Sequence, residues 1–199
     1  MASAPTEQQA KTVEFTRMDK GSVEDYQLLH TLEQQYIAKL PDRILHALEG
    51  LDNSLSGYKI TRLEHVLQTA TRAEKAGADD EMVVAALIHD IGDDLAPENH
   101  SQMAAAIIRP YVREQVTWIL EMHGIFQMVY YADKLGLNPE ERESYRGHKW
   151  FDEAERFCRD WDQLSFDPDY KSYPLSHFED RVRAIFSRPA FNPDIITPS

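Results

Sequence analysis

The sequence contains a single cysteine, Cys158, among its 199 residues, so no internal disulfide can form. The same scarcity argues against a structural zinc site, which needs several thiolate ligands. Eight histidines are present instead, and they favour metal chemistry through nitrogen and oxygen ligands. A chain without disulfides is typical of a reducing compartment, and we expect a cytoplasmic protein.

Basic residues are also scarce: 21 Lys and Arg stand against 34 Asp and Glu, a net charge of −13. Nucleic acids and anionic membranes would be repelled, so we expect neither as a partner. The net charge does not exclude a small anionic substrate, because a buried pocket can still be locally basic. No apolar run reaches the roughly 18 residues of a membrane span. The polar segment Met1–Lys11 lacks the apolar core of a signal peptide.

No segment alternates with a period of two, whereas apolar residues recur at spacings of three and four, which predicts an all-α fold. The predicted helices cover residues 23–40, 41–51, 62–75, 81–90, 100–108, 112–123, 139–162 and 174–186. We expect one domain, 1–199, with a loose tail (1–12), N-terminal helices (13–54), a core (55–187) and a C-terminal extension (188–199) over the surface.

Two local patterns locate the centre of this fold. Thr61 and Glu64 have the spacing of a capping box, in which each side chain satisfies a free backbone N–H at the start of a helix. The following segment, Glu81–Asp90, is apolar on nearly every side, so we expect a short buried helix that ends at Ile91-Gly92.

Side chains that can bind a metal fall at or near the ends of predicted helices, where they can converge on one cavity. They are His65, His89, Asp90, His100, His123 and Asp162. A His-Asp pair at the end of an apolar helix is costly without partners, and a metal supplies one. A lone buried histidine is more often a hydrogen-bonded core residue, but the full set favours iron, manganese or zinc. One carboxylate can bridge two ions, and four histidines with two aspartates supply enough ligands for two metals, so two metals are expected.

The order of these residues resembles that of the HD-domain superfamily of metal-dependent proteins. The run LEHVLQTATRAEKAGADDEMVVAALIHDIG is similar, nearly position by position, to the HD-domain oxygenases that cleave organophosphonates. The segments ENHSQMAA, ILEMHG, RDWD and LSHFEDRVRAIFSRP keep that family's order and spacing. The resemblance covers roughly residues 55–190, and the inserted pair His100 and His123 is similar to the dinuclear branch.

The resemblance implies an HD-domain helical bundle with a mixed-valent Fe(II)/Fe(III) pair and O2 as co-substrate. One iron would be held by His65, His89, Asp90 and Asp162. The second would be held by His100 and His123. Asp90 would bridge the two ions and is the expected catalytic residue.

The resemblance also implies a reaction that inserts oxygen and breaks a carbon–phosphorus bond. We expect (R)-1-hydroxy-2-(trimethylammonio)ethylphosphonate to give glycine betaine and phosphate. The rival expectations are the 2-amino analogue giving glycine and phosphate, an HD phosphohydrolase that activates water, and a non-catalytic ligand-binding or scaffold domain. The expected partner is thus a small organophosphonate, and self-association into a homo-oligomer is left open.

Two positions favour the trimethylammonium head group over a primary amine. Tyr58 stands seven residues before the first histidine ligand, where the amino-substrate relative carries a glutamate. An aromatic face attracts a quaternary ammonium by about 0.5–2 kcal/mol. Asp93 would add a nearby negative charge. The alternatives for Tyr58 are that it packs its loop or ligates iron.

The phosphonate needs cations. Arg159 matches a family anion-binding position, although a surface arginine can equally pair with a neighbouring acid. A second basic cluster in YRGHKW contains Arg146, His148 and Lys149. Gln127 stands where the family has a lysine, four residues after the last histidine ligand. Another residue must therefore replace that contact, or the substrate differs.

Overall fold

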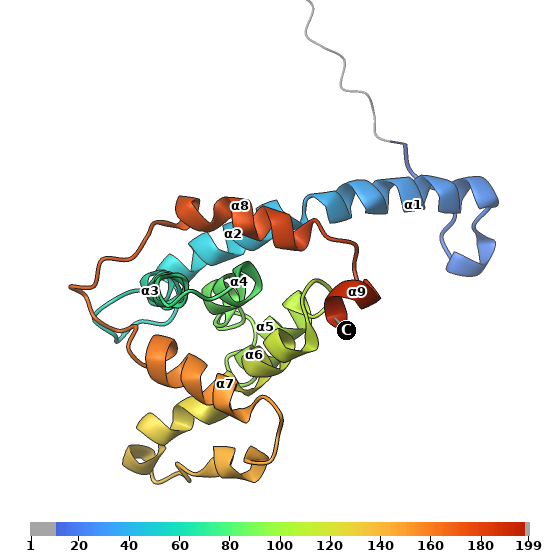
Figure 1. Ribbon diagram of the computed structural model, residues 1–199. Coiled ribbons are helices and arrows are strands. Elements are labelled where there is room, and N and C mark those ends of the chain that lie inside the picture. Colours follow the sequence, from blue (N-terminus) through green and yellow to red (C-terminus); the bar gives the residue numbers. More distant parts are fainter. Residues whose placement is uncertain (1–10, 198–199) are drawn as a thin grey trace, which may run out of the picture. The chain divides into compact units, whose positions relative to one another are not determined.

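The computed structural model describes residues 11–197, so most of the tail predicted over residues 1–12 and the last two residues of the predicted extension lie outside the described residues. The described residues form helices and turns with no strand, which confirms the all-α prediction (Figure 1). Within this range no helix has the length and apolar character to cross a membrane. The chain divides into two compact units, with the boundary after Leu40. The predicted segment limits at residues 13, 55 and 188 stay a prediction.

The first unit is built around helix α1 (Val23–Ala38), which follows the 3-10 helix η1 (Met18–Lys20). The Ser22 hydroxyl accepts a hydrogen bond from the Asp25 backbone N–H, and the Asp25 carboxylate accepts one from the Ser22 backbone N–H. This capping box fixes where the helix begins. The helix was predicted from its apolar spacing, yet none of its residues is buried.

The second unit contains the remaining helices. Their bounds are α2 (Leu40–Gly50), η2 (Leu51–Asn53), α3 (Arg62–Lys75), α4 (Asp80–Ile88), α5 (His100–Ile108), α6 (Glu114–Gln127), η3 (Met128–Tyr130), η4 (Ala132–Leu135), η5 (Glu141–Tyr145), α7 (Phe151–Arg156), η6 (Phe157–Asp162), α8 (Leu175–Phe186) and α9 (Pro193–Ile196). Helix α4 contacts α3, α6 and α8 and buries every residue from Met82 to Ile88. It is the buried helix that its composition predicts.

The single helix predicted over residues 139–162 is not formed. The 3-10 helix η5, a turn around Gly147, α7 and the π-helix η6 occupy this stretch instead. Glycine is a poor helix former, which favours the break. In η6 the backbone widens, and the Gln163 N–H donates to the Cys158 carbonyl five residues earlier. Such π-turns often occur at functional sites, and this one carries Asp162.

Two glycines allow close packing around the end of α4. A Cβ atom at Gly92 would lie 2.9 Å from backbone atoms of His100, and one at Gly124 would lie 2.7 Å from Ser101 Oγ. A larger residue at Gly92 would force the turn after α4 away from α5, whereas one at Gly124 would require the Ser101 hydroxyl to rotate away. These glycines therefore help to bring the predicted ligands together.

Candidate metal centre

The predicted capping box positions the first histidine. The Glu64 N–H donates to Thr61 Oγ1 (3.1 Å), and the Thr61 N–H donates to Glu64 Oε2 (2.8 Å). This fixes the start of α3 immediately before His65, whose ring is buried. His89 and Asp90 follow the last residue of α4 and are buried as well. The buried position of α4 thus places His89 and Asp90 in the interior of the protein.

All six residues predicted as ligands lie together in the structure. His100 begins α5, His123 lies four residues before the end of α6, and Asp162 ends η6. Their nitrogen and oxygen atoms form three overlapping groups in which all atoms lie within 4.8 Å of one another: His65 with His89 and Asp162, His89 with Asp90 and His123, and Asp90 with Asp93 and His100. Their role as ligands stays a prediction.

Asp90 lies between two pairs of histidines. Its Oδ2 atom is 3.3 Å from His65 Nε2 and 3.5 Å from His89 Nε2. Its Oδ1 atom is 3.5 Å from His100 Nε2 and 3.4 Å from His123 Nε2. Because each oxygen faces a different pair, the carboxylate can be shared between two cations.

The four imidazoles are held from behind by backbone carbonyl groups. The Nδ1 atoms of His65, His89, His123 and His100 lie 2.8, 2.8, 2.7 and 3.3 Å from the carbonyl oxygens of Ser165, Ala86, Leu120 and Pro97, respectively. A carbonyl can only accept, so each Nδ1 must carry the proton that it donates. In the neutral ring this leaves a lone pair at Nε2, as found in histidines that bind metals.

These atoms fit a metal and are unfavourable without a cation. The Nε2 atoms of His65 and His89 lie only 3.0 Å apart. The buried Nε2 of His123 has no hydrogen-bond partner among the described residues. Bonds of about 2.0–2.2 Å to one ion would place neighbouring ligand atoms roughly 3 Å apart. Imidazole and carboxylate donors suit iron, manganese and zinc.

The electrostatics of the cluster support the same conclusion. Burial alone would lower the pKa of His65, but hydrogen bonds to Asp162 and Asp90 outweigh it and raise the pKa to about 10. Burial would raise the pKa of Asp90, but the charge of His89 and the approach of His123 Nε2, 3.4 Å from Oδ1, hold it well below its usual range. The cluster therefore needs positive charge, which protons supply when no metal does.

We expect metal binding to release protons and to strengthen as the pH rises. The raised pKa of His65, about 10, keeps this imidazole protonated at neutral pH, so its proton competes with the metal until the pH passes that value. Calorimetric titration of the metal-free protein with Mn(II), in buffers of different ionisation enthalpy, counts the released protons. The variant His46→Gln, which removes an exposed histidine, should release the same number. Binding without proton release at neutral pH would contradict the prediction.

A pocket of about 420 Å³ opens onto this cluster. Four of its lining residues are aromatic: Tyr58, Tyr130, Tyr131 and Phe166. Of the predicted substrate contacts, Tyr58 and Gln127 lie here. The Tyr58 ring stacks on Phe166 with centroids 5.0 Å apart, and Gln127 Oε1 is buried without a hydrogen-bond partner among the described residues.

The negative charge expected from Asp93 is paired with an arginine. Its Oδ2 atom lies 2.8 Å from Arg62 Nε, and its Oδ1 atom lies 3.6 Å from His100 Nδ1. The carboxylate is neutralised by the arginine and packs behind a candidate metal ligand. It is not among the residues that line the pocket.

The four basic residues proposed for the phosphonate also lie outside the pocket lining. Arg159 pairs with Asp160, Arg146 pairs with Glu143, His148 stacks on Trp118, and Lys149 lies over the ring of Trp150. Neighbouring acids and aromatic rings thus hold all four. For Arg159, pairing with a neighbouring acid is the alternative that was stated from the sequence.

Arg62 was not among the residues predicted from the sequence to contact the substrate. Among the described residues that line the pocket, it is the one arginine or lysine. Its Nη1 atom lies 3.4 Å from Asp90 Oδ2. The available signal was its position three residues before His65, which places both side chains on one face of α3.

Comparisons with known proteins agree with this geometry. The family model described as the HD domain matches residues 62–167, more than half of the chain. The [1-hydroxy-2-(trimethylamino)ethyl]phosphonate dioxygenase (glycine-betaine-forming) of Leisingera caerulea is 31% identical over 83 residues. That match covers 36% of this chain and 42% of the relative, so it spans less than half of the relative's length. The helical bundle, the buried His-Asp cluster and the family match together show that the chain belongs to the HD-domain family.

Proposed function

We propose that this protein is a di-iron oxygenase that cleaves the C–P bond of (R)-1-hydroxy-2-(trimethylammonio)ethylphosphonate. The substrate and one O2 would give glycine betaine, phosphate and a proton. The C–H and C–P bonds at C1 break, and their four electrons reduce O2 as C1 becomes a carboxylate. The name of the partly similar relative supports this choice of substrate.

The observation that carries the proposal is the placement of Asp90 between two pairs of histidines. The first site would use His65, His89, Asp90 and Asp162, and the second would use Asp90, His100 and His123. When bound, an iron pair supplies the redox capacity for O2 chemistry and the Lewis acidity that orients the substrate. The carbonyl-bound imidazoles keep their lone pairs aimed at these sites.

Arg62 is suited to bind the phosphonate group. Its Nε lies 2.8 Å from Asp93 Oδ2, yet both atoms are buried without a directed hydrogen bond among the described residues. The contact is an ion pair through Nε, and Arg62 lines the pocket beside the metal centre. A planar guanidinium matches two oxygens of a phosphonate. Arg62 thus replaces the lysine missing at Gln127, whose buried Oε1 can accept from the substrate hydroxyl.

The aromatic side chains are suited to bind the trimethylammonium group. A quaternary ammonium has no N–H donor, so it gains little from a hydrogen-bond acceptor and is attracted to aromatic faces. The carboxylates that line the pocket, those of Asp90 and Asp162, face the imidazoles. A primary amine would find no free carboxylate among the lining residues. This favours the trimethylammonium substrate over its amino analogue.

The test is an assay of phosphate release from both enantiomers of the substrate, with O2 consumption recorded in parallel. We expect one phosphate per O2, glycine betaine as the second product, and no turnover under anaerobic conditions. Low-temperature EPR of the aerobically purified protein should show a spin-coupled mixed-valent signal. Undiminished phosphate release without oxygen would exclude the oxidative reaction.

The same assay distinguishes the alternatives. Preferred turnover of the 2-amino analogue would assign the glycine-forming reaction. Oxygen-independent hydrolysis of phosphomonoesters with Mn(II) or Co(II) would assign a phosphohydrolase.

We expect Tyr58→Ala to raise the KM for the trimethylammonium substrate about two- to thirtyfold, which corresponds to a cation–π contribution of about 0.5–2 kcal/mol. The KM for the amino analogue should change less. Tyr58→Phe keeps the ring and should behave like the unmodified protein. Steady-state kinetics with both substrates check this, and equal effects of Tyr58→Ala on both would remove Tyr58 from the ammonium site.

A further inference from the structure

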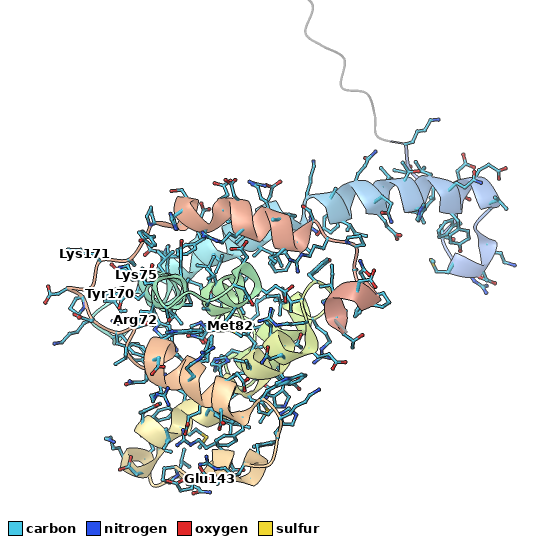
Figure 2. All side chains as sticks on the ribbon, viewed as in Figure 1. Arg72, Lys75, Met82, Glu143, Tyr170 and Lys171 are labelled. Atoms are coloured by element: carbon cyan, nitrogen blue, oxygen red, sulfur yellow. The ribbon has the colours of Figure 1, made fainter. Side chains whose placement is uncertain are left out.

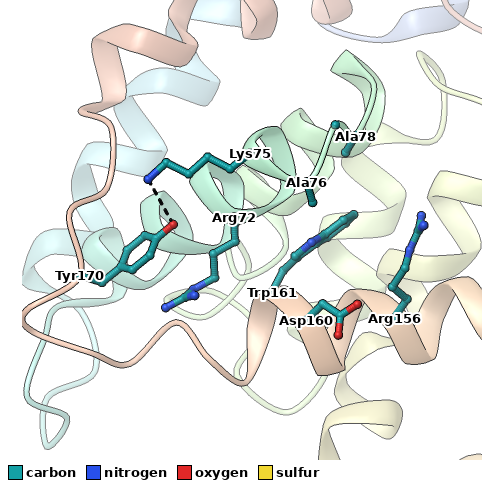
Figure 3. Close-up of a pocket in the computed structure, with 9 residues that line it drawn as sticks. Arg72, Lys75, Ala76, Ala78, Arg156, Asp160, Trp161 and Tyr170 are labelled. Carbon is teal, nitrogen blue, oxygen red and sulfur yellow. Dashed lines mark hydrogen bonds between the residues drawn. The ribbon is translucent and has the colours of Figure 1, made fainter.

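A second cavity, of about 400 Å³, lies on another face of α3 (Figure 3). The last turn of α3, the helices α7 and η6, and the loop that carries Tyr170 surround it. It shares no lining residue with the pocket at the metal centre. Trp161, which forms part of its wall, immediately precedes the candidate ligand Asp162.

Three cations without an acidic partner line this cavity: Arg72, Lys75 and Arg156. Ion pairs neutralise most arginines in the described part of the chain, but none is formed by these three side chains. The acid that lines the cavity, Asp160, pairs with Arg159 at 2.7 Å. A chain of net charge −13 thus gathers three cations and one carboxylate at one cavity.

Arg72 is held in place with an unused donor. Its Nη2 donates to the Leu164 carbonyl at 3.0 Å, and its guanidinium lies 3.9 Å from the centroid of the Tyr170 ring. Its Nε atom is buried and has no hydrogen-bond partner among the described residues. Lys75 Nζ lies 3.5 Å from the Tyr170 hydroxyl, and these side chains lie close together in Figure 2. In Figure 3, Arg72 lies between Tyr170 and Trp161.

We propose that this cavity binds a small organic phosphate. A phosphate group carries up to two negative charges and several acceptor oxygens, which match cations from two sides of the cavity. The cavity is larger than a single phosphate ion needs, and the Trp161 indole and the alanines at the end of α3 give it an apolar wall. The ligand is therefore a phosphate with a small organic group.

A purely structural role does not account for all of these contacts. Cations in the last turn of a helix interact favourably with the helix dipole, which would explain Lys75 and the charge of Arg72. It does not explain why Arg156, which belongs to α7 and lies 5.7 Å from the centroid of the Trp161 ring, lines the same cavity. An anionic ligand explains why cations from two helices line one cavity.

Calorimetric titration of the metal-loaded full chain with inorganic phosphate and with phenylphosphonate tests the proposal. The double variant Lys75→Gln/Arg156→Gln removes two exposed cations and should weaken phosphate binding at least tenfold. The matched control Arg146→Gln/Lys149→Gln removes the same charge elsewhere and should change binding less than twofold. Phenylphosphonate should bind more tightly than phosphate, because its ring can contact the apolar wall.

Each contrary result is decisive. Equal weakening by the two double variants would show a general charge effect, and no binding up to about 10 mM phosphate would exclude the site. Loss of all phosphate binding in Arg62→Gln would assign the binding to the metal pocket instead. If phenylphosphonate binds no more tightly than phosphate, the proposal that the ligand carries an organic group is wrong. None of these outcomes depends on turnover, so they are independent of the proposed oxygenase activity.

Discussion

Replacement of Asp90 by asparagine should remove both metal binding and O2-dependent phosphate release. The amide keeps the size of the carboxylate but loses its charge. It also offers a single oxygen atom, whereas each oxygen of the Asp90 carboxylate faces a different pair of histidines. We expect the iron content to fall from about two ions per chain to fewer than one. We expect kcat/KM to fall on the order of 10³-fold or more.

Asp94→Asn is the matched control, because it makes the same change of charge four residues later, at an exposed position. It should keep the full iron content and activity. Circular dichroism and thermal unfolding of the metal-free forms separate loss of metal from loss of fold. An Asp90→Asn protein that retains two irons would show that this carboxylate does not bridge the pair.

The sequence predicted the centre of the fold because local signals and burial agree there. Thr61 and Glu64 mark the start of α3 through hydrogen bonds that depend only on nearby backbone atoms. The apolar segment of α4 can only be stable when it is buried, so its end had to lie inside the molecule. The candidate ligands fall at or near helix ends, which explains why their spacing in the sequence was informative.

The lining of the pocket was harder to predict because it depends on neighbours that are distant in the sequence. Arg159 follows a family pattern, but in this chain its guanidinium forms an ion pair with Asp160 on the surface. Asp93 follows the His-Asp pair, but Arg62 neutralises it. Helical periodicity also does not report the π-helix η6.

The assignment of Arg62 leads to the second large effect. We expect Arg62→Gln to raise the KM for the phosphonate about 10- to 150-fold, since a hydrogen bond to a charged group contributes about 1.5–3 kcal/mol. Arg159→Gln, which removes the arginine favoured by the sequence pattern, should change KM less than twofold because that side chain lies outside the pocket. Steady-state kinetics of the two variants measure the difference directly.

Arg62 also contacts Asp90 and Asp93, so the iron content of Arg62→Gln must be measured beside its KM. The double variant Arg62→Gln/Asp93→Asn removes the carboxylate that the single change leaves unpaired. If Arg62 acts on the substrate, both variants keep their iron and share the raised KM. If it only balances the charge of Asp93, the double variant restores the KM. Arg62→Lys should fall between, because a lysine supplies the charge without the planar pair of donors that matches two phosphonate oxygens.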